Sequence, residues 1–165
     1  MILYKIIGSS SILLSAFIFC VQSQKFEREK IKQAESFILL IKFIKKQIDC
    51  FCLPLYEIIA RADTQILKDC GFRYSKVTNM PPDSSFEWFI ENCCFYIDKE
   101  ATDLIEKFSS ELGRSYRDDQ LKSCDYYISG LVEYKEKLIA ELPRKRKLRC
   151  TMCVGASLSF ILLML

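Results

Sequence analysis

The residues most able to do chemistry in this chain are its cysteines, since it has nine cysteines and no histidine. Without histidine, Ser-His-Asp and Cys-His catalysis and the HExxH zinc site are excluded. Residues 150–153 have the CxxC spacing but lack the second ligand pair that a tetrahedral zinc site needs. A structural thiol pair is the favoured interpretation, and a redox motif is the alternative. We predict no catalytic residue, no metal and no cofactor.

Neither the glycines nor the paired acids predict a substrate site. The five glycines stand alone at positions 8, 71, 113, 130 and 155, so no glycine-rich loop can cradle phosphates. The acidic pairs Asp118-Asp119 and Glu133…Glu136 could suggest hydrolysis. Such pairs on helices are more often solvated faces. We therefore predict no small-molecule substrate.

The charges are unevenly distributed along the chain. It has 24 basic and 21 acidic residues in total, but the stretch 49–143 has 11 basic against 18 acidic. An acidic body with basic borders suits anionic lipid headgroups and does not suit DNA. We predict membrane lipid as a partner and no nucleic acid. The bordering basic residues are Lys25, Arg28, Lys30, Lys32, Arg144, Lys145, Arg146, Lys147 and Arg149.

Both ends of the chain are apolar. The first stretch has one charge, Lys5, over residues 2–21, and as a helix would reach roughly 30 Å, the thickness of a bilayer core. The last sixteen residues have none. We predict transmembrane helices at 2–22 and 148–165. A cleaved signal peptide is the alternative for the first, but no A-x-A cleavage site follows it.

The basic borders also predict the topology. By the positive-inside rule, the middle of the chain is cytoplasmic and both chain ends face the opposite side of the membrane. The cysteine positions show no disulfide framework, which agrees with a reducing compartment. The predicted location is therefore the cell membrane, with a cytoplasmic central domain at 23–147.

Helical periodicity dominates the middle of the chain. Apolar residues recur at helical spacing over 27–51, and a second helix is predicted from Pro54 to Gly71. The stretch 73–85 predicts a loop, and a short helix passes through Trp88. Asp98 predicts the cap of a helix that ends at Gly113, and a last helix starts near residue 118. We predict an all-α antiparallel bundle of about five helices.

Several stretches resemble one family. Residues 112–120 (LGRSYRDDQ) resemble the LGxxDxxxQ stretch of the stage III sporulation protein AB family. Residues 53–57 (LPLYE), with Ile48 before them, resemble its TPLPEA stretch, and the region of Trp88 falls where that family has a Trp helix. The family is similar to the cytoplasmic domain of type II secretion platform proteins.

The resemblance implies a non-enzymatic membrane component of the sporulation channel between mother cell and forespore. Its implied partners are a secretion-type ATPase and other membrane proteins of the channel complex, and its implied location is the mother-cell membrane. An alternative is a membrane-tethered helical adaptor of another secretion or signalling system. The implied partner-binding residues are Gly113, Arg114, Gln120, Pro54 and Glu57.

A simpler interpretation of these five positions remains open. Gly113 can simply end a helix, and Gln120 can be a solvated residue in a first turn. Pro54 and Glu57 likewise make sense as residues that start a helix.

Overall fold

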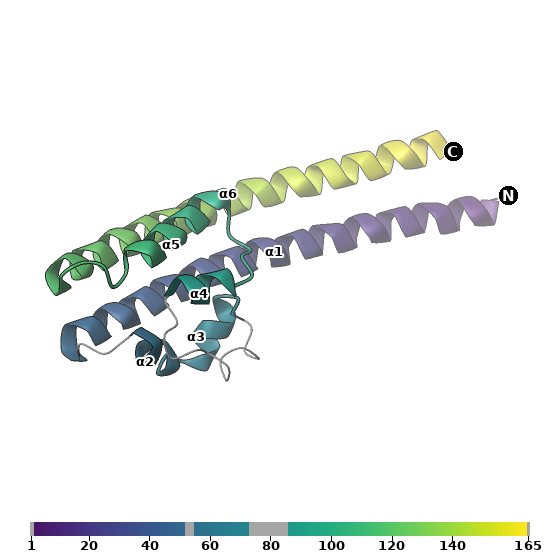
Figure 1. Ribbon diagram of the computed structural model, residues 1–165. Helices are drawn as coiled ribbons and strands as arrows, with labels where there is room; N and C mark the ends of the chain where they lie inside the picture. The colour runs from purple at the N-terminus through teal and green to yellow at the C-terminus, as the bar shows by residue number, and fades with distance from the viewer. Residues whose placement is uncertain (1, 52–54, 73–85, 165) are drawn as a thin grey trace. The chain divides into compact units, whose positions relative to one another are not determined.

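The computed structural model describes the backbone of residues 2–51, 55–72 and 86–164 and most of their side chains. All its regular elements in these ranges are helices, with one isolated β-bridge between Phe72 and Cys93. This confirms the all-α class and is consistent with a helical bundle. The helices are α1 (Ile2–Phe51), α2 (Leu55–Ala60), α3 (Thr64–Asp69), α4 (Phe86–Glu91), α5 (Lys99–Glu111) and α6 (Arg117–Met164) (Figure 1).

The chain divides into two compact units. The first comprises Met1–Arg28 and Leu138–Leu165, and the second comprises Glu29–Lys137. The long helices α1 and α6 each contribute to both units. Each helix is continuous across the boundary predicted between a terminal helix and the central domain, at residue 23 in α1 and at residue 147 in α6. Pro143 lies inside α6.

The described ends of the first unit expose many large apolar side chains. They include Leu14, Phe17, Ile18, Phe19, Leu148, Met152, Val154, Leu158 and Leu162. Among the residues that the structure describes, however, no helix has both the length and the apolar character needed to cross a membrane. The two flanking transmembrane helices predicted at 2–22 and 148–165 are therefore not supported by the structure.

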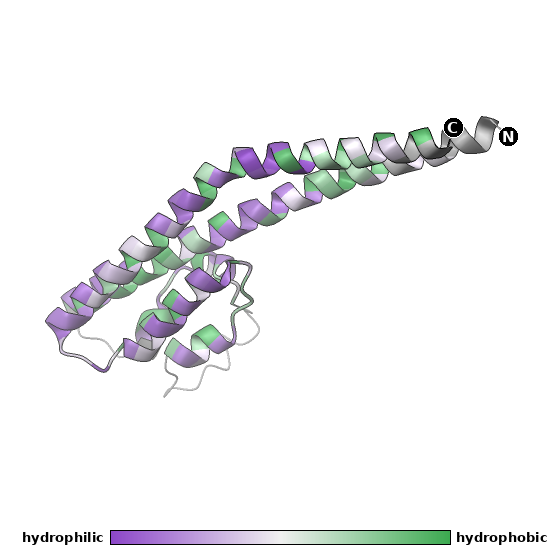
Figure 2. Cartoon of the chain, turned by 90° about the horizontal axis from the view of Figure 1, so that it is seen from above, coloured by the Kyte–Doolittle hydropathy of each residue, from purple (hydrophilic) through white to green (hydrophobic). Residues whose placement is uncertain are grey.

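In the second unit, α1 and α6 run antiparallel. Asp49 pairs with Arg117, Lys45 with Asp125 and Glu35 with Lys135, so residue numbers rise along one helix as they fall along the other. Their facing stripes are apolar and buried, and in Figure 2 the helices of this unit carry alternating hydrophilic and hydrophobic bands. Burial of such stripes supplies most of the stability of amphipathic helices. The buried hydrophobic residues of this pair in the second unit are Ala34, Phe37, Ile38, Leu40, Ile41, Ile44, Cys124, Tyr127, Leu131 and Tyr134.

An aromatic cluster joins the shorter helices to this core. Phe86 and Phe89 of α4 stack with ring centroids 5.4 Å apart, and Phe72 stacks on Phe89 at 4.6 Å. Phe108 of α5 meets Phe86 edge-on at 5.6 Å and Tyr127 of α6 at 5.4 Å. Aromatic pairs at these separations each contribute about 0.5–1.5 kcal/mol beyond their buried area.

The predicted helix from Pro54 to Gly71 is two helices. Asp63 interrupts it, because its backbone is extended and its carboxylate accepts a hydrogen bond from the N–H of Gln65 at 2.7 Å. This N-cap starts α3. The predicted end of the helix is confirmed, since Gly71 has φ +90 and its N–H donates to Lys68 O, as a C′ residue does. Pro54 lies outside the described residues.

The helix α5 begins and ends where the sequence predicts, but its first residue is not capped by the predicted side chain. Asp98 precedes the helix but makes no side-chain cap hydrogen bond. Its carboxylate instead pairs with Lys30 at 2.6 Å and accepts a hydrogen bond from the Tyr134 hydroxyl at 3.0 Å. Gly113, with φ +83, follows the end of the helix as predicted. Asp98 therefore links α1, α5 and α6 rather than capping one of them.

Candidate partner-binding site and basic pocket

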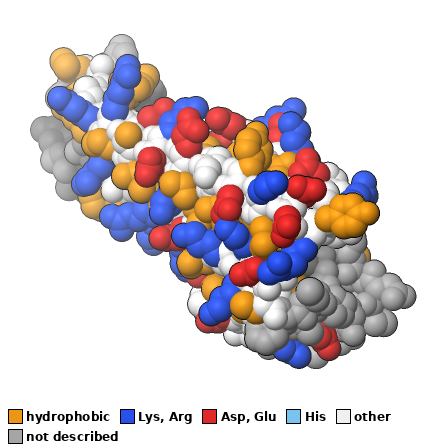
Figure 3. All heavy atoms as spheres, turned by 90° about the vertical axis from the view of Figure 1, so that its left-hand side faces the viewer, with side chains coloured by type: hydrophobic (Ala, Val, Ile, Leu, Met, Phe, Trp, Pro, Cys, Tyr) orange, Lys and Arg blue, Asp and Glu red, His pale blue; other side chains and the backbone are white. Residues whose placement is uncertain are grey.

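The connection between α5 and α6, residues 112–120, is the α5–α6 corner. It contains three of the residues implied as partner-binding, Gly113, Arg114 and Gln120. Gly113 and Arg114 are exposed, and Gln120 is half-buried. The corner lies on the side that faces the viewer in Figure 3, where acidic, basic and hydrophobic side chains are intermixed.

Two ion pairs fix the corner to other helices. The Arg114 guanidinium lies 3.2 Å from the Glu87 carboxylate of α4. Arg117 donates to both the carboxylate of Asp49, at 2.5 Å, and its backbone carbonyl, at 2.9 Å, at the end of α1. Exposed pairs add little stability individually, but a two-fold contact on one residue restricts the geometry.

Gln120 shapes this turn from within. Its side-chain amide donates to the carbonyl of Ser115 at 2.8 Å, and its backbone N–H donates to the carbonyl of Tyr116 at 2.9 Å. The side chain of Gln120, half-buried in the first turn of α6, therefore closes the corner by this hydrogen bond. The turn projects Tyr116, whose side chain is 89% exposed.

The sequence alone did not single out Tyr116 or Arg117. A fully exposed tyrosine beside arginines resembles the residues that dominate binding energy at protein interfaces. The signal available in the sequence was an aromatic residue inside a polar turn. Glu57, by contrast, pairs with Arg61 at 3.8 Å within its own stretch, and no described contact joins it to the corner.

The basic residues that border the central segment differ in their surroundings. Lys30 and Lys32 belong to the second unit and pair there with Asp98 and Asp69. The hydrogen bond to Asp69 raises the pKa of Lys32. In the first unit, Lys25, Arg28, Arg144, Arg146 and Lys147 are exposed.

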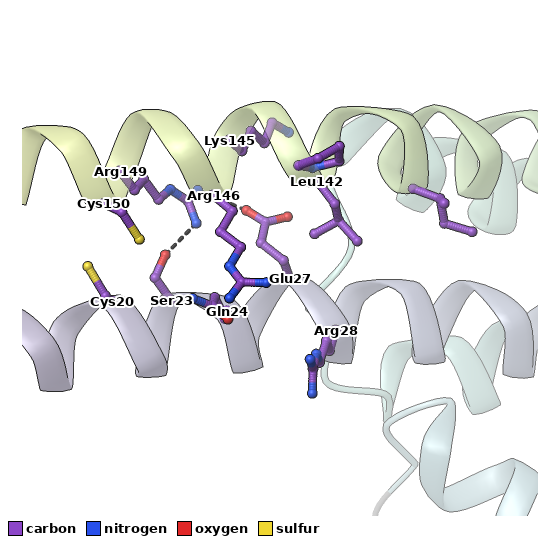
Figure 4. Close-up of a pocket in the computed structure, with 12 residues that line it drawn as sticks. Cys20, Ser23, Gln24, Glu27, Arg28, Leu142, Lys145, Arg146, Arg149 and Cys150 are labelled. Atoms are coloured by element: carbon purple, nitrogen blue, oxygen red, sulfur yellow. Dashed lines mark hydrogen bonds and ion pairs between the residues drawn. The ribbon is translucent and has the colours of Figure 1, made fainter.

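A pocket of about 310 Å³ lies in the first unit between α1 and α6 (Figure 4). The Arg149 guanidinium pairs there with Glu27 at 2.8 Å and also donates to the Ser23 hydroxyl. Glu27 is only 5% exposed, so its charge needs this partner. Because the partner comes from α6, 122 residues away, no local pattern could predict the pair.

The cysteines are free thiols where the structure describes them. Cys20 and Cys150 line the pocket from opposite helices, and their sulfur atoms point toward one another in Figure 4. Within the described ranges, no group of three or more His, Cys, Asp or Glu is placed to hold a metal ion. Burial raises the pKa of Cys93 to about 12, so at neutral pH its thiol is protonated and a poor nucleophile.

The family model of stage III sporulation protein AB matches residues 5–165. The chain belongs to this family. The match confirms the predicted resemblance to this family, and membership implies a sporulation-associated role. No curated protein and no solved structure matches the chain.

Proposed function

We propose that this member of the stage III sporulation protein AB family is a non-enzymatic membrane component of the channel complex between mother cell and forespore. Its central domain would be cytoplasmic and would contact a secretion-type ATPase. The observation that carries the proposal is the family match over residues 5–165. It supports this role over that of an adaptor in another secretion or signalling system. The absence of histidine from the sequence favours a role without catalysis.

The first unit supports attachment to the mother-cell membrane. Phe17 is 68% exposed, Phe19 61% and Met152 66%, and such side chains seek either lipid or a protein partner. Exposed basic residues lie next to these apolar stretches on both helices, among them Lys25 of α1 and Arg144 of α6. Lys and Arg beside an apolar surface gain from anionic headgroups, by about 1 kcal/mol each.

The α5–α6 corner is the surface of the second unit best suited to the ATPase. Its backbone is restrained by Arg114, Arg117 and Gln120, so little conformational entropy would be lost on binding. Tyr116 stands exposed at its tip. A rigid turn that presents an aromatic side chain meets the usual requirements of a binding hot spot.

Co-purification of the full-length chain with the secretion-type ATPase from sporulating cells tests the proposal. We expect Tyr116→Ala and Gln120→Ala to lose most of the ATPase. Gln120→Ala removes one partly exposed hydrogen bond. It should therefore lower the free energy of unfolding by only about 0.5–1.5 kcal/mol, and the variant should stay folded. Gln65 is an exposed glutamine of α3, so Gln65→Ala is the matched control and should retain the ATPase.

Two outcomes would contradict the role of the corner. If Tyr116→Ala and Gln120→Ala retain the ATPase as well as Gln65→Ala does, the ATPase binds elsewhere. If Gln120→Ala unfolds the chain, the residue is structural. Failure of the wild-type chain to retain any ATPase would contradict the proposed partner itself.

A further inference from the structure

The wall of the pocket in the first unit has more basic than acidic residues. Four basic residues line it, Arg28, Lys145, Arg146 and Arg149, against one acid, Glu27. Glu27 is already neutralised by Arg149 at 2.8 Å, and Lys145 pairs with Glu141 at 2.8 Å. Two guanidinium groups are left with no acidic partner among the described residues, those of Arg28 and Arg146.

Arg146 is the best placed of these groups. In Figure 4 its side chain extends from α6 across to α1, where its guanidinium lies beside Gln24 and near Glu27. Arg149 is held in position one turn away by both Glu27 and Ser23. A planar guanidinium offers paired donors that match two oxygens of one phosphate. The pocket thus has donors for a single phosphate group.

We propose that this pocket binds the headgroup of an anionic phospholipid, with Arg146 as the main phosphate ligand. The inference rests on the membrane attachment proposed above. The volume of the pocket, about 310 Å³, is at the lower limit of the ~300–1,000 Å³ usual for small-molecule sites. The pocket therefore suits a headgroup and not the acyl chains. The acyl chains would lie on the apolar side chains toward the chain ends, Phe17 and Phe19 on α1 and Met152 and Val154 on α6.

The composition of the lining favours this ligand over a nucleotide. No aromatic residue is among the described lining residues, so a base would have no ring to stack on. Ile139, Leu142 and Pro143 supply a non-polar part of the wall, and Cys20 and Cys150 lie on its side nearer the chain ends. Basic pockets between helices at a membrane surface bind anionic headgroups by the same combination of charge and apolar wall.

Titration of the full-length chain with lipid tests the site. The chain is purified in a neutral detergent, and phosphatidylglycerol or phosphatidylcholine adducts are counted by native mass spectrometry. We expect phosphatidylglycerol to bind at least about tenfold more tightly, and Arg146→Gln to abolish that preference, since a hydrogen-bonded charge pair typically corresponds to a factor of about ten or more. Arg144→Gln is the matched control, because Arg144 is exposed, basic and outside the pocket lining. It should weaken binding no more than about fivefold, as expected for one surface charge.

Three results would overturn the site. Equal losses in Arg146→Gln and Arg144→Gln would mean diffuse attraction rather than a pocket. Glycerol 3-phosphate bound as tightly as phosphatidylglycerol would mean recognition of a free phosphate ester. Phosphatidylcholine bound as tightly as phosphatidylglycerol would mean that the pocket does not select charge. Fractionation of sporulating cells separates this failure from that of the proposed location: a chain absent from the membrane fraction would overturn the attachment itself.

Discussion

Gln33 is a buried polar residue of α1 that joins two backbone segments of the second unit, one after α3 and one after α4. It is 1% exposed, and its amide donates to the carbonyls of Cys70 at 2.9 Å and Cys94 at 2.8 Å. Its oxygen accepts from the N–H groups of Tyr96 at 2.7 Å and Ile97 at 3.2 Å. One side chain thus satisfies backbone groups for which no helix provides a partner.

We predict that Gln33→Leu lowers the free energy of unfolding by about 2–4 kcal/mol. The leucine keeps the volume but leaves buried carbonyl and N–H groups unpaired, at about 1–3 kcal/mol for each that water cannot reach. Denaturant titration can follow the single tryptophan, Trp88, whose ring meets Phe72 edge-on at 6.1 Å. Gln65→Leu is the control, since Gln65 is exposed, and should change the value by about 0.5 kcal/mol at most. Similar losses in both variants would refute the role of Gln33.

Tyr134 gives the second unit an alkaline pH dependence. Burial, and to a lesser extent the hydrogen bond that its hydroxyl donates to the Asp98 carboxylate, raise the pKa of its phenol to about 12, from an ordinary value of about 10. The folded state binds the phenolic proton more tightly than the unfolded state. The resulting stability is therefore complete below about pH 10 and is lost as the pH rises toward 12.

We expect Tyr134→Phe to flatten this loss. The variant should be less stable than the parent at pH 8, because the backbone N–H of Asp98 loses the hydroxyl that it donates to at 3.0 Å. Between pH 10 and 12 its unfolding free energy should fall less steeply than that of the parent. Urea titrations at pH 8, 10 and 11 measure both effects. Parallel curves would show that Tyr134 does not titrate in this way.

Sequence reasoning identified apolar residues of the core better than polar ones. Phe108 and Leu131 follow from helical periodicity, which depends only on local spacing. Gln33 does not, because its partners are more than thirty residues away in the chain. Asp98 was recognised as a helix start, but its charge is taken by Lys30, which only the tertiary structure brings near.

At the scale of elements, two glycines end helices under different constraints. Both have positive φ, +90 at Gly71 and +83 at Gly113. A Cβ at Gly71 would collide with the backbone carbonyl of Cys94, whereas nothing lies within 4 Å of one at Gly113. Only the first glycine is required by packing as well as by conformation.

We predict that Gly113→Ala lowers the unfolding free energy by about 1 kcal/mol and Gly71→Ala by at least about 2 kcal/mol. The smaller value is the usual cost of a left-handed backbone for a residue with a Cβ. The larger includes displacement of the segment that contains Cys94. Thermal melting of the two variants side by side gives the comparison. Equal effects would mean that the contact at Gly71 relaxes without cost.

Helix ends were less predictable than helix existence. The break between α2 and α3 depends on Asp63, a good N-cap residue that lies inside the single helix predicted from Pro54 to Gly71. The buried face of α6 includes Tyr127 and Tyr134 beside Leu131 and Cys124. Tyrosine is ambiguous in a sequence, because its ring is apolar while its hydroxyl needs a partner.

At the scale of the whole molecule, the proposed topology makes a prediction about thiol labelling. Cys94 is exposed, whereas Cys70 and Cys124 are both fully buried. Burial also raises the pKa of Cys70 well above its usual range, so this thiol is unreactive for two reasons. Cys94, like the exposed Cys50, can therefore report on which side of the membrane the second unit lies.

We predict that a membrane-impermeant maleimide leaves Cys94 unmodified in intact sporulating cells and modifies it once the membrane is permeabilised. The reason is the basic border of the central segment, which by the positive-inside rule keeps that segment in the cytoplasm. Mass spectrometry of the peptide that contains Cys94 measures the modification, and Cys94→Ser is the control for labelling of its neighbour Cys93. Modification of Cys94 before permeabilisation would place the second unit outside the cytoplasm. Since an ATPase needs cytoplasmic nucleotide, that result would also contradict its proposed contact with the α5–α6 corner.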